Sequence, residues 1–109
     1  MSKREWSIEK EWEYKGYECI VTYALNAYCT GFRCGYVVLK DKEYVEDDLI
    51  GCHGGVTWHG YHDRLGKTVI GFDCAHYGDT LDNCTLEYCM GECESIVEQI
   101  LKLKENTDD

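Results

Sequence analysis

The chain has 109 residues, of which 44% are hydrophobic and 13% aromatic, so it has the apolar content of one folded domain rather than of a disordered chain. It carries 11 basic and 21 acidic residues, which gives a formal net charge of −10. A surface this negative repels phosphate groups, which argues against direct binding of nucleic acid and against docking on an anionic membrane. We therefore expect a single domain over residues 1–109 whose partner is a protein with a basic surface.

The cysteine content bears on the cellular compartment. Eight cysteines are present, and an even number is compatible with a disulfide framework. However, the first residues, Met-Ser-Lys-Arg-Glu-Trp, are charged and lack the apolar core of a secretory signal. A chain of this size also folds without covalent cross-links. We expect free thiols in a reducing cytoplasm, and no apolar run approaches the ~20 residues that cross a bilayer.

The first half of the chain has the composition of β-strands. Residues 1–15 are dense in charge and predict an arm that leads into a strand. Residues 17–25 and 32–40 are rich in β-branched and aromatic side chains, which is typical of strands. The connection at 26–31 is short, so these two strands should form an antiparallel hairpin.

An acidic stretch and a second hairpin follow. Residues 41–51 predict a solvated loop with one helical turn near residues 45–49. Residues 55–59 and 67–73 predict two strands that turn back on each other near residue 63. Gly71 interrupts the second of these strands, which indicates a bulge or a close backbone approach.

The last third of the chain changes to helical periodicity. Apolar residues recur at the i, i+3, i+4 spacing from Thr85 to about Glu105, with Asp82, Asn83 or Thr85 as the cap. The apolar stripe needs a partner, and a sheet face is the only one available. The sequence therefore predicts an α+β fold in which an antiparallel sheet of about four strands, made of two hairpins, packs against one long C-terminal amphipathic helix.

Two glycine-flanked histidine stretches stand at one end of the second predicted hairpin. If the hairpin turns near residue 63, Trp58 pairs with Val69 to within about two positions, and the two stretches converge. The side chains that we expect there form a candidate polar cluster: His53, Asp73, Cys74, His76 and Asp79.

This cluster admits three interpretations. Cysteine, histidine and carboxylate groups are zinc ligands, although no Cys-x-x-Cys motif is present. A Cys–His pair built from Cys52 or Cys74 and a neighbouring histidine could serve a small enzyme as nucleophile and base. The leading interpretation is structural, with the polar groups bonding the backbone of the glycine loops, and it requires neither a cofactor nor a metal.

Acidic residues provide the candidate surface for a basic partner, because exposed carboxylates complement exposed cations. We place this surface on the acidic loop and on the polar face of the helix. The residues concerned are Glu43, Glu46, Asp47, Asp48, Glu92, Glu94 and Glu98.

Four motifs carry a resemblance to a known family. They are Gly-Tyr-Glu-Cys-Ile-Val (16–21), Cys-Gly-Tyr-Val-Val (34–38), His-Gly-Gly-Val-Thr-Trp (53–58) and Ile-Gly-Phe-Asp-Cys-Ala-His-Tyr-Gly-Asp (70–79). Together they resemble small uncharacterised proteins encoded by bacteriophages and prophages. The sequence departs from that family in lacking a proline-containing stretch after residue 38.

The resemblance implies a phage accessory protein in the cytoplasm of a bacterial host. Such proteins commonly bind a host or defence protein, and some inhibit nucleic-acid-binding complexes, as anti-CRISPR proteins do. We expect a non-enzymatic binding protein of this kind. The alternatives are a metal- or Cys/His-dependent enzyme that uses His53, Asp73, Cys74 and His76, and a structural phage protein that self-associates through its tyrosine-rich face.

Overall fold

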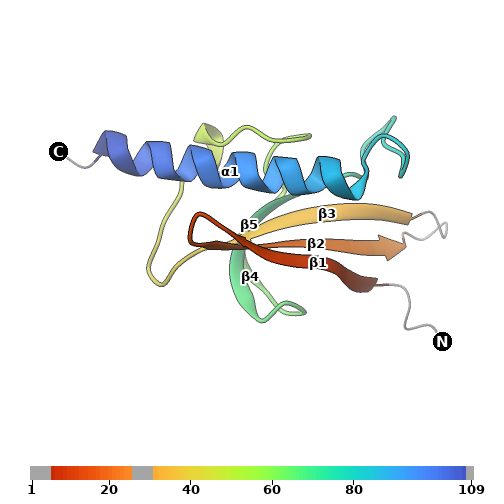
Figure 1. Cartoon of the computed structure of the whole chain (residues 1–109), viewed down its shortest axis with the longest axis horizontal. Coiled ribbons are helices and arrows are strands. Elements are labelled where there is room, and N and C mark those ends of the chain that lie inside the picture. The colour runs from red at the N-terminus through yellow and green to blue at the C-terminus, as the bar shows by residue number, and fades with distance from the viewer. Residues whose placement is uncertain (1–5, 26–30, 108–109) are drawn as a thin grey trace.

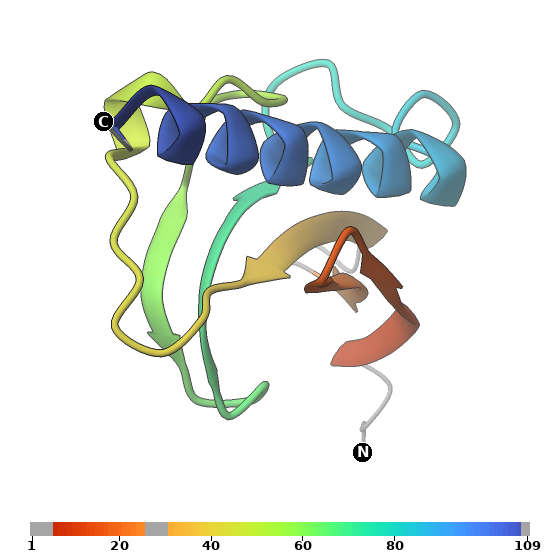
Figure 2. The same cartoon turned by 60° about the vertical axis from the view of Figure 1, so that its left-hand side comes forward.

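The computed structural model describes residues 6–25 and 31–107, and it has the predicted α+β architecture. One antiparallel sheet lies against one long helix (Figures 1 and 2). The elements in chain order are β1 (Trp6–Tyr14), β2 (Tyr17–Leu25), β3 (Gly31–Val38), the short 3-10 helix η2 (Asp47–Leu49), β4 (Trp58–His62), β5 (Lys67–Asp73) and α1 (Leu86–Thr107).

The sheet has five strands rather than the four expected, in the order β1-β2-β3-β5-β4. The additional strand is β1, which we predicted as an arm and which instead pairs antiparallel with β2 along its length. Both predicted hairpins are present, because β2 pairs with β3 and β4 pairs with β5. Most of the turn predicted at 26–31 lies outside the described residues.

The second hairpin pairs within the predicted margin of about two positions. Trp58 pairs with Gly71, two positions from the predicted partner Val69. The strand begins at Trp58 instead of residue 55, because Gly54 and Gly55 have positive φ angles that extended backbone does not accommodate. The close backbone approach predicted at Gly71 is present, because a side chain at this position would overlap the backbone of Gly35.

The helix α1 covers one face of the sheet, as Figure 1 shows. Its apolar stripe is fully buried at Cys89, Cys93, Ile96, Val97 and Ile100. The cap is Thr85, whose Oγ1 accepts the backbone N–H of Tyr88 at 3.1 Å. The main hydrophobic core therefore lies between α1 and the sheet, while a smaller cluster of Ile20, Cys34, Tyr36 and Val69 lies on the opposite sheet face.

Two further sequence predictions concern thiols and membranes. The seven cysteines that the structure describes are all free thiols. Within the described residues, no helix combines the length and the apolar character needed to cross a bilayer.

Candidate functional site

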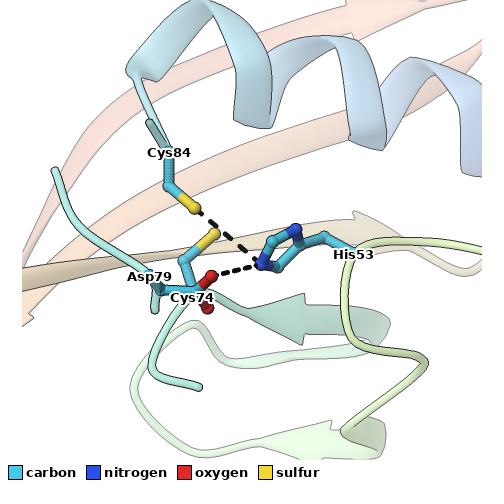
Figure 3. Close-up of side chains that lie close together, drawn as sticks. All are labelled: His53, Cys74, Asp79 and Cys84. Carbon is cyan, nitrogen blue, oxygen red and sulfur yellow. Dashed lines mark hydrogen bonds and ion pairs between the residues drawn. The ribbon is translucent and has the colours of Figure 1, made fainter. Parts of the chain in front are cut away.

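Two segments of the chain converge beside the N-terminal end of α1 (Figure 3). The loop before β4 supplies His53, and the segment between β5 and α1 supplies Cys74, Asp79 and Cys84, the last directly before the helix cap. One ligand-type atom from each of these four residues lies within 4.8 Å of the others. We call this group the His53 cluster.

His53 is the best-anchored member of the His53 cluster. Its Nε2 lies 2.9 Å from Oδ1 of Asp79, and its Nδ1 lies 2.9 Å from the hydroxyl of Tyr88. Its backbone N–H donates to Oε1 of Glu92 at 2.8 Å. A histidine whose second ring nitrogen is fixed by a hydrogen bond has a defined tautomer and orientation, which is the usual arrangement of metal-binding histidines.

Local backbone contacts place Asp79 and Cys84. Oδ2 of Asp79 accepts the backbone N–H of His76 at 3.0 Å, which closes a short turn. Thr80 and Asn83 then bond each other's backbone N–H groups through their side chains. The backbone N–H of Cys84 donates to the carbonyl of Thr80. These short-range contacts explain why a segment without regular structure holds its side chains in place.

The two thiols of the His53 cluster are buried. Cys74 and Cys84 are nearly inaccessible to solvent, and Sγ of Cys84 lies 3.8 Å from Nε2 of His53. A third cysteine adjoins the group, because Sγ of Cys74 lies 3.8 Å from Sγ of Cys89. The site thus combines sulfur, nitrogen and oxygen donors in a largely water-excluded position.

Burial and hydrogen bonding together set the protonation of these groups when no cation is present. Burial raises the pKa of the Cys84 thiol. The thiol therefore stays protonated and is a poor nucleophile for a Cys–His pair in which His53 is the base. Burial also acts to raise the pKa of Asp79, but the hydrogen bonds from His53 and from the backbone of His76 outweigh it, and the pKa is lowered. Asp79 is therefore a carboxylate, the form that ligates metals.

The geometry fits a tetrahedral zinc ion. Zinc lies about 2.0–2.3 Å from each of its ligands, which places tetrahedral ligand atoms roughly 3.3–3.8 Å apart. The Cys84–His53 separation of 3.8 Å already matches, while the His53–Asp79 separation of 2.9 Å is that of a hydrogen bond. Coordination requires a small outward movement of Asp79 and the approach of any donor pair that lies near the 4.8 Å limit.

The structure unites most of the predicted polar cluster. His53, Cys74 and Asp79 converge, and the His53 and His76 rings lie 6.1 Å apart. Asp73 and His76 stay outside the donor set: Nδ1 of His76 lies 3.5 Å from Oδ1 of Asp73 and 3.4 Å from Oδ2 of Asp79. His76 packs over Gly54, where a side chain would overlap its ring.

Sequence reasoning missed Cys84 and Tyr88. Pairing within the predicted hairpin placed only residues near the strand ends, whereas Cys84 reaches the site through the packing of α1 on the sheet. The available signal was the position of Cys84 directly before Thr85, one of the predicted helix caps. A cap fixes where a helix begins, and therefore which preceding side chain lies at its end.

The acidic residues predicted for partner binding do not form one continuous surface. On one side of α1, Glu92 accepts the backbone N–H of His53. On the other side, Glu94 accepts the indole N–H of Trp12 at 3.0 Å, and Glu98 pairs with Lys15 at 2.8 Å. The three helix glutamates thus attach α1 to its neighbours.

The four residues of the 41–51 loop that were predicted for partner binding also differ in their surroundings. Asp47 forms a close pair with Nδ1 of His59, and Glu43 points inward, with its side chain only 8% exposed. Glu46 and Asp48 are exposed, and their carboxylates make no hydrogen bond or ion pair within the described residues.

Glu43 makes a testable contribution to stability. It accepts the hydroxyl of Tyr17 and lies 3.2 Å from Nζ of Lys104. Burial acts to raise the pKa of Glu43, but these contacts and the backbone N–H of Lys40 outweigh it and lower the pKa. The stabilisation is therefore present above the ordinary glutamate value of 4.5 and is lost as the pH falls through the lower folded-state value.

We expect Glu43→Gln to lower the free energy of unfolding by about 1.5–3 kcal/mol at neutral pH, because hydrogen bonds to a buried charge are lost. Urea unfolding at a series of pH values measures the difference. It should shrink below pH 4.5, where the wild-type carboxylate also becomes protonated. Asp48→Asn, at an exposed position, is the matched control and should change little. A difference that stays constant down to the lowest pH would contradict the assignment.

Comparisons of the chain with protein-family models, with curated proteins and with solved structures gave no match. The class of protein is therefore defined by the fold and the site: a small α+β domain that carries a Cys₂HisAsp donor set beside the N-terminal end of its helix.

Proposed function

We propose that this protein binds zinc through the His53 cluster. The observation that carries the proposal is the convergence of two thiols, one imidazole nitrogen and one carboxylate oxygen within 4.8 Å. Thiolate and imidazole ligands favour zinc over magnesium and calcium, which bind oxygen ligands. The hydrogen bond from Tyr88 to His53 supports the same conclusion, because it orients the ring before a metal arrives.

The zinc would have a structural role. Four protein ligands fill a tetrahedral site and leave no open position for a substrate, which is the pattern of structural zinc sites. The ligands also come from distant parts of the chain: His53 and Cys84 are 31 residues apart. The metal would therefore fasten the segment between β5 and α1 to the loop before β4.

Elemental analysis of protein purified with zinc and a thiol reductant tests this proposal. We expect about one zinc per chain for the wild type and a large loss of zinc for Cys84→Ser and His53→Gln. Cys52→Ser is the control, because Cys52 neighbours His53 but lies outside the His53 cluster. A wild-type protein that takes up no zinc, or a Cys84→Ser variant that retains it fully, would refute the proposal.

A second function, the binding of a basic partner protein, is favoured by the net charge of −10 and by exposed carboxylates that no cation of the described chain neutralises. In this proposal the protein is a phage-type accessory factor, and its partner is a host or defence protein with a cationic surface, including a nucleic-acid-binding complex. Binding of a lysine-rich probe that weakens with added salt tests it, because salt screens exposed charges.

A further inference from the structure

An open groove lies between the 40–49 segment and the C-terminal half of α1, far along the helix from the His53 cluster. Its volume is about 760 Å³, which is within the range of ligand-binding pockets. Val45 and Ile100 form a buried apolar floor. Tyr44 and Leu49 form the rim and are 74% and 58% exposed. Large apolar side chains that stay exposed beside a groove of this size mark a contact surface.

The cations at the groove are already engaged. Nζ of Lys104 lies 3.2 Å from Glu43, and Nζ of Lys40 lies 4.3 Å from the centre of the Tyr17 ring. By contrast, the exposed carboxylates of Asp41, Glu46 and Asp48 have no partner within the described part of the chain. The charge that the groove offers to an incoming molecule is therefore negative.

Charge also decides what can occupy the groove. A second copy of this chain would bring another net charge of −10, and nucleic acids and anionic lipids would be repelled for the same reason. A basic segment with a large apolar side chain complements both the negative charge and the apolar floor of the groove. Its cations would pair with the exposed carboxylates while its apolar group packs on the floor. Amphipathic segments bind grooves of other proteins in this way.

We propose that this groove, defined by Asp41, Tyr44, Val45, Glu46, Leu49 and Ile100, is the docking surface for a lysine- or arginine-rich protein segment with an apolar anchor. The inference rests on the second proposed function, the binding of a basic partner, and assigns it a location. It is independent of the zinc site, which lies at the other end of α1.

The test uses a fluorescent amphipathic peptide of lysine and leucine as the probe, with fluorescence anisotropy as the readout. We expect the double variant Tyr44→Ser/Leu49→Ser to weaken binding by about tenfold or more, because exposed anchors dominate such contacts. Asp41→Asn/Glu46→Gln should weaken binding at low salt and reduce the salt dependence. All four side chains are exposed, so the fold should persist, and far-UV circular dichroism checks this.

Two matched controls lie elsewhere on the surface. Tyr61→Ser removes an aromatic side chain on β4 that is 61% exposed, and Glu11→Gln/Glu13→Gln removes two exposed charges on β1. If the groove variants bind the probe no more weakly than these controls, the docking surface is wrong although the partner-binding function stands. If the wild type binds the probe no better than a version with glutamate in place of lysine, both proposals fail.

Discussion

Ile96→Asp is expected to abolish folding of this domain. Ile96 is completely buried in the stripe of α1 that faces the sheet, within the cluster that also contains Val21, Val37 and Phe72. The substitution removes about 1.5–3 kcal/mol of hydrophobic stabilisation and also places an unpaired carboxylate in the core, which costs several kcal/mol more. Because small domains are stable by only about 5–15 kcal/mol, the sum approaches the entire free energy of folding.

The matched control is Ile8→Asp, the same substitution on the edge strand β1, where the side chain is 40% exposed. Circular dichroism and urea unfolding measure both variants. We expect Ile96→Asp to lack a cooperative transition and Ile8→Asp to unfold cooperatively with a modest loss of stability. A cooperative transition near the wild-type midpoint for Ile96→Asp would show that the helix does not pack against the sheet as described.

If the His53 cluster binds zinc as proposed, removal of the metal should give the second-largest effect. A ligand present at a hundredfold excess over its dissociation constant stabilises the native state by about 2.7 kcal/mol, which for a domain of this size corresponds to roughly 10 °C in Tm. We therefore expect a chelator to lower the Tm of the wild type by roughly this amount. The metal-free protein should remain folded, because Cys74 and Cys84 still pack in the core as buried thiols and His53 and Asp79 lie outside it.

The position of the change separates a local metal site from a global effect. Hydrogen exchange should show that amides of residues 74–85 lose protection on chelation while those of β2 and β3 keep it. The reason is that the metal would hold only residues 74–85 in place. Cys84→Ser is the control and should not respond to the chelator. Equal responses of this variant and the wild type, or no response of either, would contradict the site.

The proposed zinc site and the proposed docking groove lie at opposite ends of α1, so each can be tested without disturbing the other. Chelation should act on the His53 cluster, and the Tyr44 and Leu49 variants should act on the groove. If the protein serves as a phage-type accessory factor, zinc would maintain the shape of one end while the groove at the other end contacts the basic partner. Measuring probe binding with and without a chelator shows whether the two ends are coupled.

The sequence alone determined the local elements, because their signals lie within a few residues. The apolar spacing from Leu86 to Ile100 predicted α1, and alternating β-branched and aromatic residues predicted β2, β3 and β5. Reversal of the chain near residue 63 was also predicted, and it brings His53 close to Cys74 and Asp79. The histidine, cysteine and aspartate types at this end made metal ligation one possible interpretation from the start.

Only the tertiary structure decided which residues meet across elements. The entry of Cys84 into the His53 cluster and the inward direction of Glu43 both depend on how α1 lies on the sheet. The sequence pattern around a helical carboxylate is the same whether the group faces water or the indole of Trp12. The side chain opposite it decides its role, and local periodicity carries no information on that contact.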